Sequence, residues 1–204
     1  MRKYNLVGLT GQTGAGKGLV SSVFKENGWA VIDADKLARQ ALTPGSPALY
    51  GLCAAFGDDI LKTDGTVDRP LLAKRAFSSR ASTDILNSLT HPYILQLVLK
   101  EISDLVSKGE TNILYDAPQL IESRTHLLCD HVITVLAKEE IRLERIMQRD
   151  NISRYNALLR IKAQHSEDFY ISKSDTVIEN NGSKEETENT AYSLQKTLKN
   201  KRSE

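Results

Sequence analysis

Short apolar segments alternate along the chain with stretches whose apolar positions recur at helical spacing. The segments with the length of buried strands lie at residues 4–10, 29–32, 111–115, 131–136 and 176–178. Strands of a parallel sheet form continuous apolar runs because helices cover both faces of the sheet. The alternation therefore predicts an α/β fold built on a central parallel sheet.

The stretch between the second and third predicted strands, about residues 44–109, has a helical pattern and little strand character. Prolines near the first helical position predict three helix starts: Pro47 after the N-cap residue Ser46, with a helix to Phe56; Pro70; and Pro92, with a helix to about Ser107. Between the first two of these helices, Asp64-Gly65 predicts a surface turn or small hairpin. We therefore expect a helical insertion in the α/β domain.

Three further helices are expected after the fourth predicted strand. The first covers residues 138–150, and Ser153 can cap a second that extends to Gln164. In the third, Ser183 and Glu186 have the spacing of a capping box, in which two side chains satisfy N–H groups at the helix start. This last helix is expected to pack as a closing helix.

A glycine-rich loop follows the first predicted strand and leads into a helical pattern. Its residues are Gly11, Gln12, Thr13, Gly14, Ala15, Gly16, Lys17 and Gly18, followed by Leu19. Glycines let the backbone curl so that N–H groups point at phosphate oxygens, while the helix N-terminus and Lys17 add positive charge. This arrangement predicts a P-loop that binds a nucleoside triphosphate; the alternative is a glycine-rich turn between core elements.

One position of this motif is unusual. A P-loop ends in Ser or Thr, whose hydroxyl binds Mg²⁺, but this chain has Gly18 there. The prediction of nucleotide binding stands, while the way in which Mg²⁺ is held stays open.

Acidic residues follow two other predicted strands, at the end of the sheet where ligands collect in parallel α/β folds. Asp33 and Asp35 come just after the second strand, and either carboxylate can accept or orient the proton of an attacking hydroxyl. The alternative is that one of them only caps the following helix. Asp116 ends the third strand in the pattern of a Walker-B acid, which holds Mg²⁺ directly or through water.

Three arginines share one side of the helix predicted for residues 138–150. Arg142, Arg145 and Arg149 are spaced i, i+3 and i+7, while the apolar residues of this helix point elsewhere. With the arginines of the next helix they can form a lid that closes over the triphosphate and excludes water. The alternative is a solvated basic face, and the spacing alone does not decide between the two.

The amino-acid composition indicates which kinds of binding partner and cellular compartment to expect. Acidic and basic residues nearly cancel, at 26 and 27, and a net charge of +1 argues against a general nucleic-acid-binding protein. Cys53 and Cys129 have neither zinc-site nor disulfide-framework spacing, which fits a reducing compartment. No apolar stretch has membrane-spanning length and the N-terminus lacks a signal-peptide pattern, so we expect a soluble cytoplasmic protein that binds neither nucleic acid nor membrane.

The motifs resemble those of the dephospho-CoA kinase family over nearly the whole chain. They are Gly8-Leu9-Thr10-Gly11 before the P-loop; Val31-Ile32-Asp33-Ala34-Asp35 with Ala38-Arg39; Pro44-Gly45 with Phe56-Gly57; Asp64-Gly65 with Asp68-Arg69; Leu89-Thr90-His91-Pro92; Asp116-Ala117-Pro118-Gln119-Leu120-Ile121-Glu122; Gln148-Arg149-Asp150; and Asn181-Gly182-Ser183. An ordered set of this size is far more specific than a P-loop alone. The chain departs from the family pattern at Gly18, at Gln119 where an apolar residue is usual, and at Glu179 where Asp is usual.

The resemblance implies transfer of the γ-phosphoryl group of ATP to the ribose 3′-hydroxyl of dephospho-CoA, with Mg²⁺ as the metal. The catalytic residues that it implies are Asp35, Lys17, Arg145 and Arg149. The implied ATP-binding residues are the P-loop from Gly11 to Leu19, Arg142 and Asn181, the last against the base. Dephospho-CoA would be bound by Asp33, Asp35, Arg39, His91, Pro92, Asp116 and Pro118, and Asp116 would also be a ligand of Mg²⁺.

The resemblance also implies that a single P-loop domain has three parts. These are a core of residues 1–43, 110–137 and 175–204, a helical CoA subdomain of about 44–109, and a lid region of about 138–174. Two alternatives stay open: a P-loop kinase of another small acceptor, and a nucleotide-binding protein whose catalysis is weakened by Gly18. The oligomeric state does not follow from the sequence.

Overall fold

The computed structural model describes residues 3–200 of the chain. These residues form two compact units. One holds the described residues up to Asp33 together with those from Asp104 onward, and the other is the segment 34–103. The first unit contains the strands, and the second is helical.

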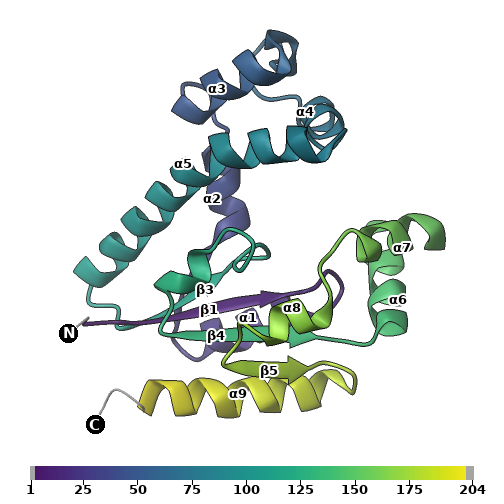
Figure 1. Ribbon diagram of the computed structural model, residues 1–204. Helices are drawn as coiled ribbons and strands as arrows, with labels where there is room; N and C mark the ends of the chain where they lie inside the picture. The colour runs from purple at the N-terminus through teal and green to yellow at the C-terminus, as the bar shows by residue number, and fades with distance from the viewer. Residues whose placement is uncertain (1–2, 201–204) are drawn as a thin grey trace. The chain divides into compact units, whose positions relative to one another are not determined.

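A parallel sheet forms the centre of the first unit (Figure 1). Its strands are β1 (Asn5–Gly11), β2 (Ala30–Asp33), β3 (Asn112–Asp116), β4 (His131–Leu136) and β5 (Thr176–Glu179), in the order β2-β3-β1-β4-β5. All neighbouring pairs are parallel, which confirms the predicted α/β fold and its strands. Because β1 is the central strand, the glycine-rich loop that follows it lies at the middle of the sheet's carboxyl edge.

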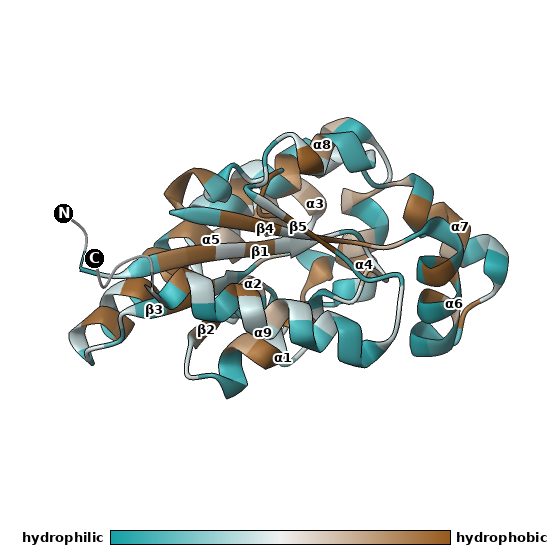
Figure 2. Cartoon of the chain, turned by 90° about the horizontal axis from the view of Figure 1, so that it is seen from below, coloured by the Kyte–Doolittle hydropathy of each residue, from teal (hydrophilic) through white to brown (hydrophobic). Residues whose placement is uncertain are grey.

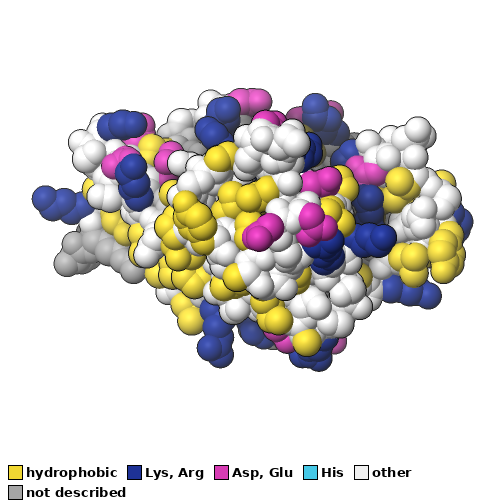
Figure 3. All heavy atoms as spheres, turned by 90° about the horizontal axis from the view of Figure 1, so that it is seen from above, with side chains coloured by type: hydrophobic (Ala, Val, Ile, Leu, Met, Phe, Trp, Pro, Cys, Tyr) yellow, Lys and Arg dark blue, Asp and Glu magenta, His cyan; other side chains and the backbone are white. Residues whose placement is uncertain are grey.

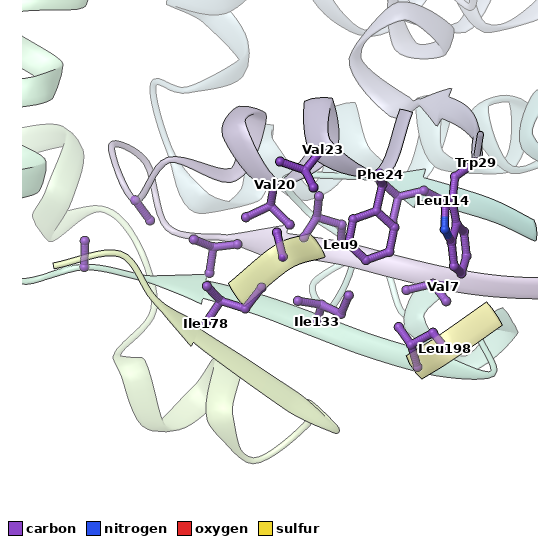
Figure 4. Packing of buried hydrophobic residues seen from close by; sticks show 14 residues of the cluster. Val7, Leu9, Val20, Val23, Phe24, Trp29, Leu114, Ile133, Ile178 and Leu198 are labelled. Carbon is purple, nitrogen blue, oxygen red and sulfur yellow. The ribbon is translucent and has the colours of Figure 1, made fainter. Parts of the chain in front are cut away.

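Helices α1 (Lys17–Glu26) and α9 (Lys184–Asn200) pack on one face of this sheet. Figure 4 shows Val20 and Phe24 of α1 against Leu9 and Ile133 of the strands. The ring of Phe24 also contacts that of Trp29, with centroids 5.0 Å apart. Burial of each large apolar side chain stabilises the fold by about 1.5–3 kcal/mol. The packing thereby holds the start of α1 next to the carboxyl edge of the sheet.

The other helices of the first unit follow β3 and β4. They are α6 (Glu139–Asp150), α7 (Arg154–Lys162), α8 (Glu167–Ile171) and a 3₁₀ turn at Thr125–Leu128. Leu143 and Ile146 of α6 pack on Ala157 and Ile161 of α7, so the two helices form one small apolar cluster. Figure 2 shows alternating hydrophobic and hydrophilic residues in α6 and mainly hydrophobic ones along β1. The short helix α8 was not predicted, because five residues are too few for a periodic pattern.

Two helix starts are capped as predicted. Ser153 Oγ accepts a hydrogen bond from the N–H of Asn156 at 3.3 Å, at the start of α7. At the start of α9, Glu186 Oε2 accepts from the N–H of Ser183 at 2.7 Å and Ser183 Oγ accepts from the N–H of Glu186 at 3.2 Å. Each cap satisfies N–H groups that have no partner within the helix and contributes roughly 1 kcal/mol.

The second unit has a helical core of its own. Its elements are α2 (Ala34–Gln40), α3 (Pro47–Phe56), a 3₁₀ turn at Asp58–Ile60, α4 (Arg69–Ala76) and most of α5 (Arg80–Ser107). Leu52, Phe56 and Leu72 are among its buried residues. The Asp64-Gly65 turn closes a small hairpin as predicted, with a bridge between Leu61 and Val67. Hydrophobic side chains also lie exposed between charged ones, as the space-filling view shows (Figure 3).

The predicted helix start at Pro92 is wrong. Pro92 lies inside α5, a helix of 28 residues that begins at Arg80. A proline removes one backbone hydrogen bond and costs about 3 kcal/mol inside a helix. Packing on both sides of the proline offsets this cost. Before it, Leu86 and Leu89 contact the core of the unit, and after it, Val98 is buried.

In the described part of the chain, neither α5 nor any other helix is long and apolar enough to cross a membrane.

Candidate active site

The glycine-rich loop between β1 and α1 has a backbone that requires glycine at two positions. Gly14 and Gly16 have positive φ angles of 77° and 95°, which side chains other than glycine rarely adopt. A Cβ at Gly16 would also lie 2.0 Å from Asn180 Nδ2. The predicted P-loop thus has the tight curvature that its glycines imply.

Side chains outside the loop orient its peptide groups. Thr13 O accepts a hydrogen bond from Arg142 Nε at 2.9 Å, and Ala15 O accepts from Asn180 Nδ2 at 2.8 Å. Because a trans peptide is planar, the N–H groups of Gly14 and Gly16 point away from these two donors. With the N–H groups in the first turn of α1, they form a set of donors suited to an anion.

Lys17 and Asp116 form an ion pair at the carboxyl edge of the sheet. Only 19% of the Lys17 side chain and 13% of the Asp116 side chain are exposed. Asp116 is in register with Leu9 of β1 on one side and with Asp33 of β2 on the other. The structure thus brings the Lys17 ammonium and the carboxylates of Asp116 and Asp33 to the carboxyl ends of neighbouring strands, where the sequence predicted polar side chains to meet.

Arg142 is buried beneath the glycine-rich loop, with 3% of its surface exposed. Besides its bond to Thr13 O, its Nη1 donates to Gln12 Oε1 at 2.6 Å and its Nη2 donates to Gln164 Oε1 at 2.9 Å. Burial lowers the pKa of the guanidinium, and the charge of nearby Glu167 opposes this shift. A solvated basic face is therefore the wrong interpretation for Arg142, whose hydrogen bonds support the loop. Its contact with a nucleotide stays a prediction.

The other two arginines of α6 have different surroundings. Arg145 Nη1 donates to Ala15 O at 3.3 Å and its Nη2 donates to Asn180 Oδ1 at 3.3 Å, so this residue also contacts the loop. The side chain of Arg149 is 59% exposed and donates from Nε to Asp150 Oδ1 at 2.7 Å. This hydrogen bond lowers the pKa of Asp150 and raises that of Arg149. Arg160 of α7 pairs with the same carboxylate.

The turn after β5 supplies a residue whose role the sequence did not indicate. Asn180 is 3% exposed; its Nδ2 holds Ala15 O, and its Oδ1 accepts from Arg145 and from Thr187 Oγ1 at 2.8 Å. Its neighbour Asn181, which was predicted to face the base, accepts from the N–H of Lys138 at 2.8 Å. The only sequence signal for Asn180 is a polar pair directly after a strand, which does not tell which of the two is buried.

Several predicted substrate-binding residues belong to the second compact unit or its helices. Asp35 lies in the first turn of α2 and Arg39 in its last turn, while His91 and Pro92 lie in α5. Asp33 ends β2 in the first unit, directly before α2. The roles of these residues stay predictions.

The remaining predicted site residues lie around the glycine-rich loop. Pro118 O accepts from Thr10 Oγ1 at 3.2 Å, which ties the segment after β3 to β1. Leu19 is in the first turn of α1, where its N–H donates to Gly16 O at 3.0 Å. Gly18 is exposed, and a Cβ there would have nothing within 4 Å. A side chain at position 18 would therefore meet open space.

A magnesium ion fits these residues together with the phosphates of a nucleotide. Among the described side chains, no group of three or more His, Cys, Asp or Glu residues is placed to hold a metal. Asp116 offers one carboxylate, and the space beside Gly18 is open. Mg²⁺ commonly binds one or two carboxylates along with substrate phosphates and water, so a complete protein cage is not needed.

Comparison with known proteins supports the same family as the motifs. The family model for dephospho-CoA kinase matches residues 5–186. A dephospho-CoA kinase of Carboxydothermus hydrogenoformans is 42% identical over 182 residues, which cover 89% of this chain and 88% of the relative. One of Listeria monocytogenes is 37% identical over 196 residues, which cover 96% of this chain and 98% of the relative.

Solved structures give the same result for the fold. TT1252 from Thermus thermophilus matches with a TM-score of 0.81 at 28% identity, and dephospho-CoA kinase from Campylobacter jejuni with 0.72 at 26%. Each match covers 97% of this chain and 99% of the other. A shikimate kinase from Acinetobacter baumannii, at a TM-score of 0.52 and 15% identity, shares the fold alone. The extent of the family match and of the related sequences shows that the chain belongs to the dephospho-CoA kinase family.

Proposed function

We propose that this protein transfers the γ-phosphoryl group of ATP to the ribose 3′-hydroxyl of dephospho-CoA, giving coenzyme A and ADP. The observation that carries the proposal is the glycine-rich loop with the Lys17–Asp116 pair, in a chain that matches the family over residues 5–186. In the reaction, a bond forms between the 3′-oxygen and the γ-phosphorus while the bond to the bridging oxygen of ADP breaks.

The loop would hold the phosphates of ATP. The N–H groups of Gly14 and Gly16 and the start of α1 would bind phosphate oxygens, and the Lys17 ammonium would contact the β- and γ-phosphates. The transition state is loose and spreads negative charge over the transferred group, so fixed donors around it provide much of the rate. Arg145 is held against the loop, and Arg149 lies in the exposed last turn of α6. When the lid region closes, both guanidinium groups would stabilise the negative charge on the transferred phosphoryl group.

Asp35 would accept or orient the proton of the ribose hydroxyl. It follows Asp33 by two residues, and Asp33 is in register with Asp116 at the edge of the sheet. The test is a pair of matched variants. Asp35→Asn should lose most turnover and keep ATP affinity, because the carboxylate acts in the transition state. If Asp33→Asn lost turnover and Asp35→Asn retained it, the roles of the two residues would be reversed.

Mg²⁺ would be held by phosphate oxygens, water and Asp116. When bound, the ion neutralises charge on the phosphates and orients them. Position 18 offers no hydroxyl, so Asp116 would be the protein ligand, with Lys17 beside it.

A cytoplasmic location also remains part of this proposal, as expected for an enzyme that uses ATP.

The decisive experiment is an acceptor screen with ATP and Mg²⁺. Dephospho-CoA, a nucleoside monophosphate and shikimate are compared as acceptors, and the product is identified by mass. Turnover with dephospho-CoA alone is the expected result. Turnover with another acceptor and none with dephospho-CoA would establish a different small-acceptor kinase. ATP binding without turnover on any acceptor would support the alternative in which Gly18 has weakened catalysis.

A further inference from the structure

The turn between α7 and α8 is attached to the glycine-rich loop by side-chain hydrogen bonds. Gln164 Oε1 accepts from the N–H of Thr13 at 2.9 Å. In the other direction, Gln12 Nε2 donates to the backbone oxygen of His165 at 3.1 Å. Two consecutive residues of the turn therefore hold two consecutive residues of the loop, although more than 150 positions separate them in the sequence.

The same oxygen of Gln164 also binds the buried arginine. Arg142 Nη2 donates to Gln164 Oε1 at 2.9 Å, so one acceptor joins the Arg142 guanidinium and the Thr13 N–H. All three hydrogen bonds of Arg142 to the loop and the turn go to neutral oxygens. The positive charge of Arg142 is thus placed under the loop with its orientation set by amide and peptide groups.

We propose that Gln164 is a positioning residue for the nucleotide phosphates. Its side-chain oxygen fixes the two peptide groups on either side of Thr13: it accepts from the N–H of the Gln12–Thr13 peptide directly, and it orients Arg142, which donates to the carbonyl of the Thr13–Gly14 peptide. The orientation of this peptide in turn directs the N–H of Gly14, because the carbonyl of Thr13 and that N–H belong to one planar unit. Gln164 therefore acts on the nucleotide through the loop.

This inference rests on the proposed function, and it predicts an effect on one substrate only. Removal of the acceptor at position 164 leaves the Thr13 N–H and one Arg142 donor without their partner, and the loop loses its fixed orientation. Affinity for ATP and ADP should fall about tenfold, the loss expected when one loop donor, here the Gly14 N–H, no longer reaches a charged phosphate oxygen. The KM for dephospho-CoA should change by less than about twofold, since no residue of this network is among those expected to bind dephospho-CoA.

The test compares three substitutions at one position. Gln164→Leu removes the acceptor at similar size, and Gln164→Asn retains an amide that is one methylene shorter. Gln164→Glu keeps oxygen acceptors, and Arg142 next to it offsets the added charge. Asn156→Leu serves as the control, because it removes an exposed amide from α7 in the same region. ADP affinity is measured by titration on each folded protein, followed by kcat, both KM values and urea unfolding.

We expect Gln164→Leu to bind ADP about tenfold more weakly, Gln164→Asn to fall between it and the wild type, and Gln164→Glu to recover most of the affinity. The control should match the wild type. The inference is overturned if Gln164→Leu binds ADP normally, if Gln164→Glu is as impaired as Gln164→Leu, or if stability falls without a change in ADP affinity. ADP binding needs no acceptor, so a wild type that binds ADP but does not phosphorylate dephospho-CoA would refute the proposed function and leave this test intact.

Discussion

The two ends of α6 carry arginines that look equivalent in the sequence and have different environments in the structure. The inner set, Arg142 and Arg145, contacts the carbonyl groups of the glycine-rich loop. The outer set, Arg149 with Asp150 and Arg160, forms ion pairs at the surface. Arg142 is 3% exposed, whereas the side chain of Arg149 is 59% exposed.

Partners and burial, and not spacing along the helix, therefore decide how much a charged residue contributes to stability. An exposed ion pair contributes about 0–1 kcal/mol to stability because water solvates both charges when they separate. A buried hydrogen-bonded guanidinium is different, since its removal leaves acceptors without a partner and without water. We therefore expect substitutions in the inner set to affect stability and loop geometry, and substitution of Arg149 in the outer set to lower turnover with little effect on stability.

The largest effect is expected at Lys17, which belongs to the loop that the inner set contacts. Lys17→Ala should lower kcat/KM for ATP by about 100-fold, because the ammonium contacts phosphates before and during transfer. Steady-state kinetics measure this, with Lys25→Ala in the exposed last turn of α1 as the control. Unchanged ATP affinity and rate would show that the loop does not bind phosphates.

Arg142→Met should destabilise the protein by about 2 kcal/mol, because Thr13 O and two glutamine oxygens lose a donor. Arg149→Met should stay within about 0.5 kcal/mol of the wild type. Urea unfolding of the two variants side by side measures the contrast. Equal stability of the two variants would remove the distinction between the inner and outer sets.

Arg149→Ala should lower kcat by about tenfold with little change in ADP affinity or stability, if the last turn of α6 contributes a donor to the transition state. Lys162→Ala, an exposed cation at the end of α7, is the matched control. Rates are measured at saturating ATP and dephospho-CoA. A wild-type rate for Arg149→Ala would favour the solvated basic face for the outer set.

The smallest effect is expected at Gly18. Gly18→Ser places a hydroxyl in open space at the first turn of α1 and should raise the rate a few-fold at low Mg²⁺, with no change at saturating Mg²⁺. It should also tighten binding of ADP in the presence of Mg²⁺. Mg²⁺ titrations of turnover and of ADP affinity test both points. Overlapping curves for the two proteins would show that the missing hydroxyl has no effect on metal binding.

Local signals were sufficient for most elements. The strands, the caps at Ser153 and Ser183 and the hairpin at Asp64-Gly65 depend on neighbouring residues, and all were predicted. The wrong helix start at Pro92 arose because contacts with distant residues override the local signal. Proline disfavours a helix interior locally, but the packing of Leu86 and Leu89 on the unit's core maintains the helix.

The order of elements and the glycine-rich loop could be read from the sequence, because both follow from patterns within a few residues of one another. Which arginine is buried and which amide holds the loop became clear only from the packing of the folded chain. Arg142, Gln164 and Asn180 reach that loop from distant parts of the chain. Spacing along a helix tells which side chains share a face; the partner that this face meets depends on how the whole chain packs.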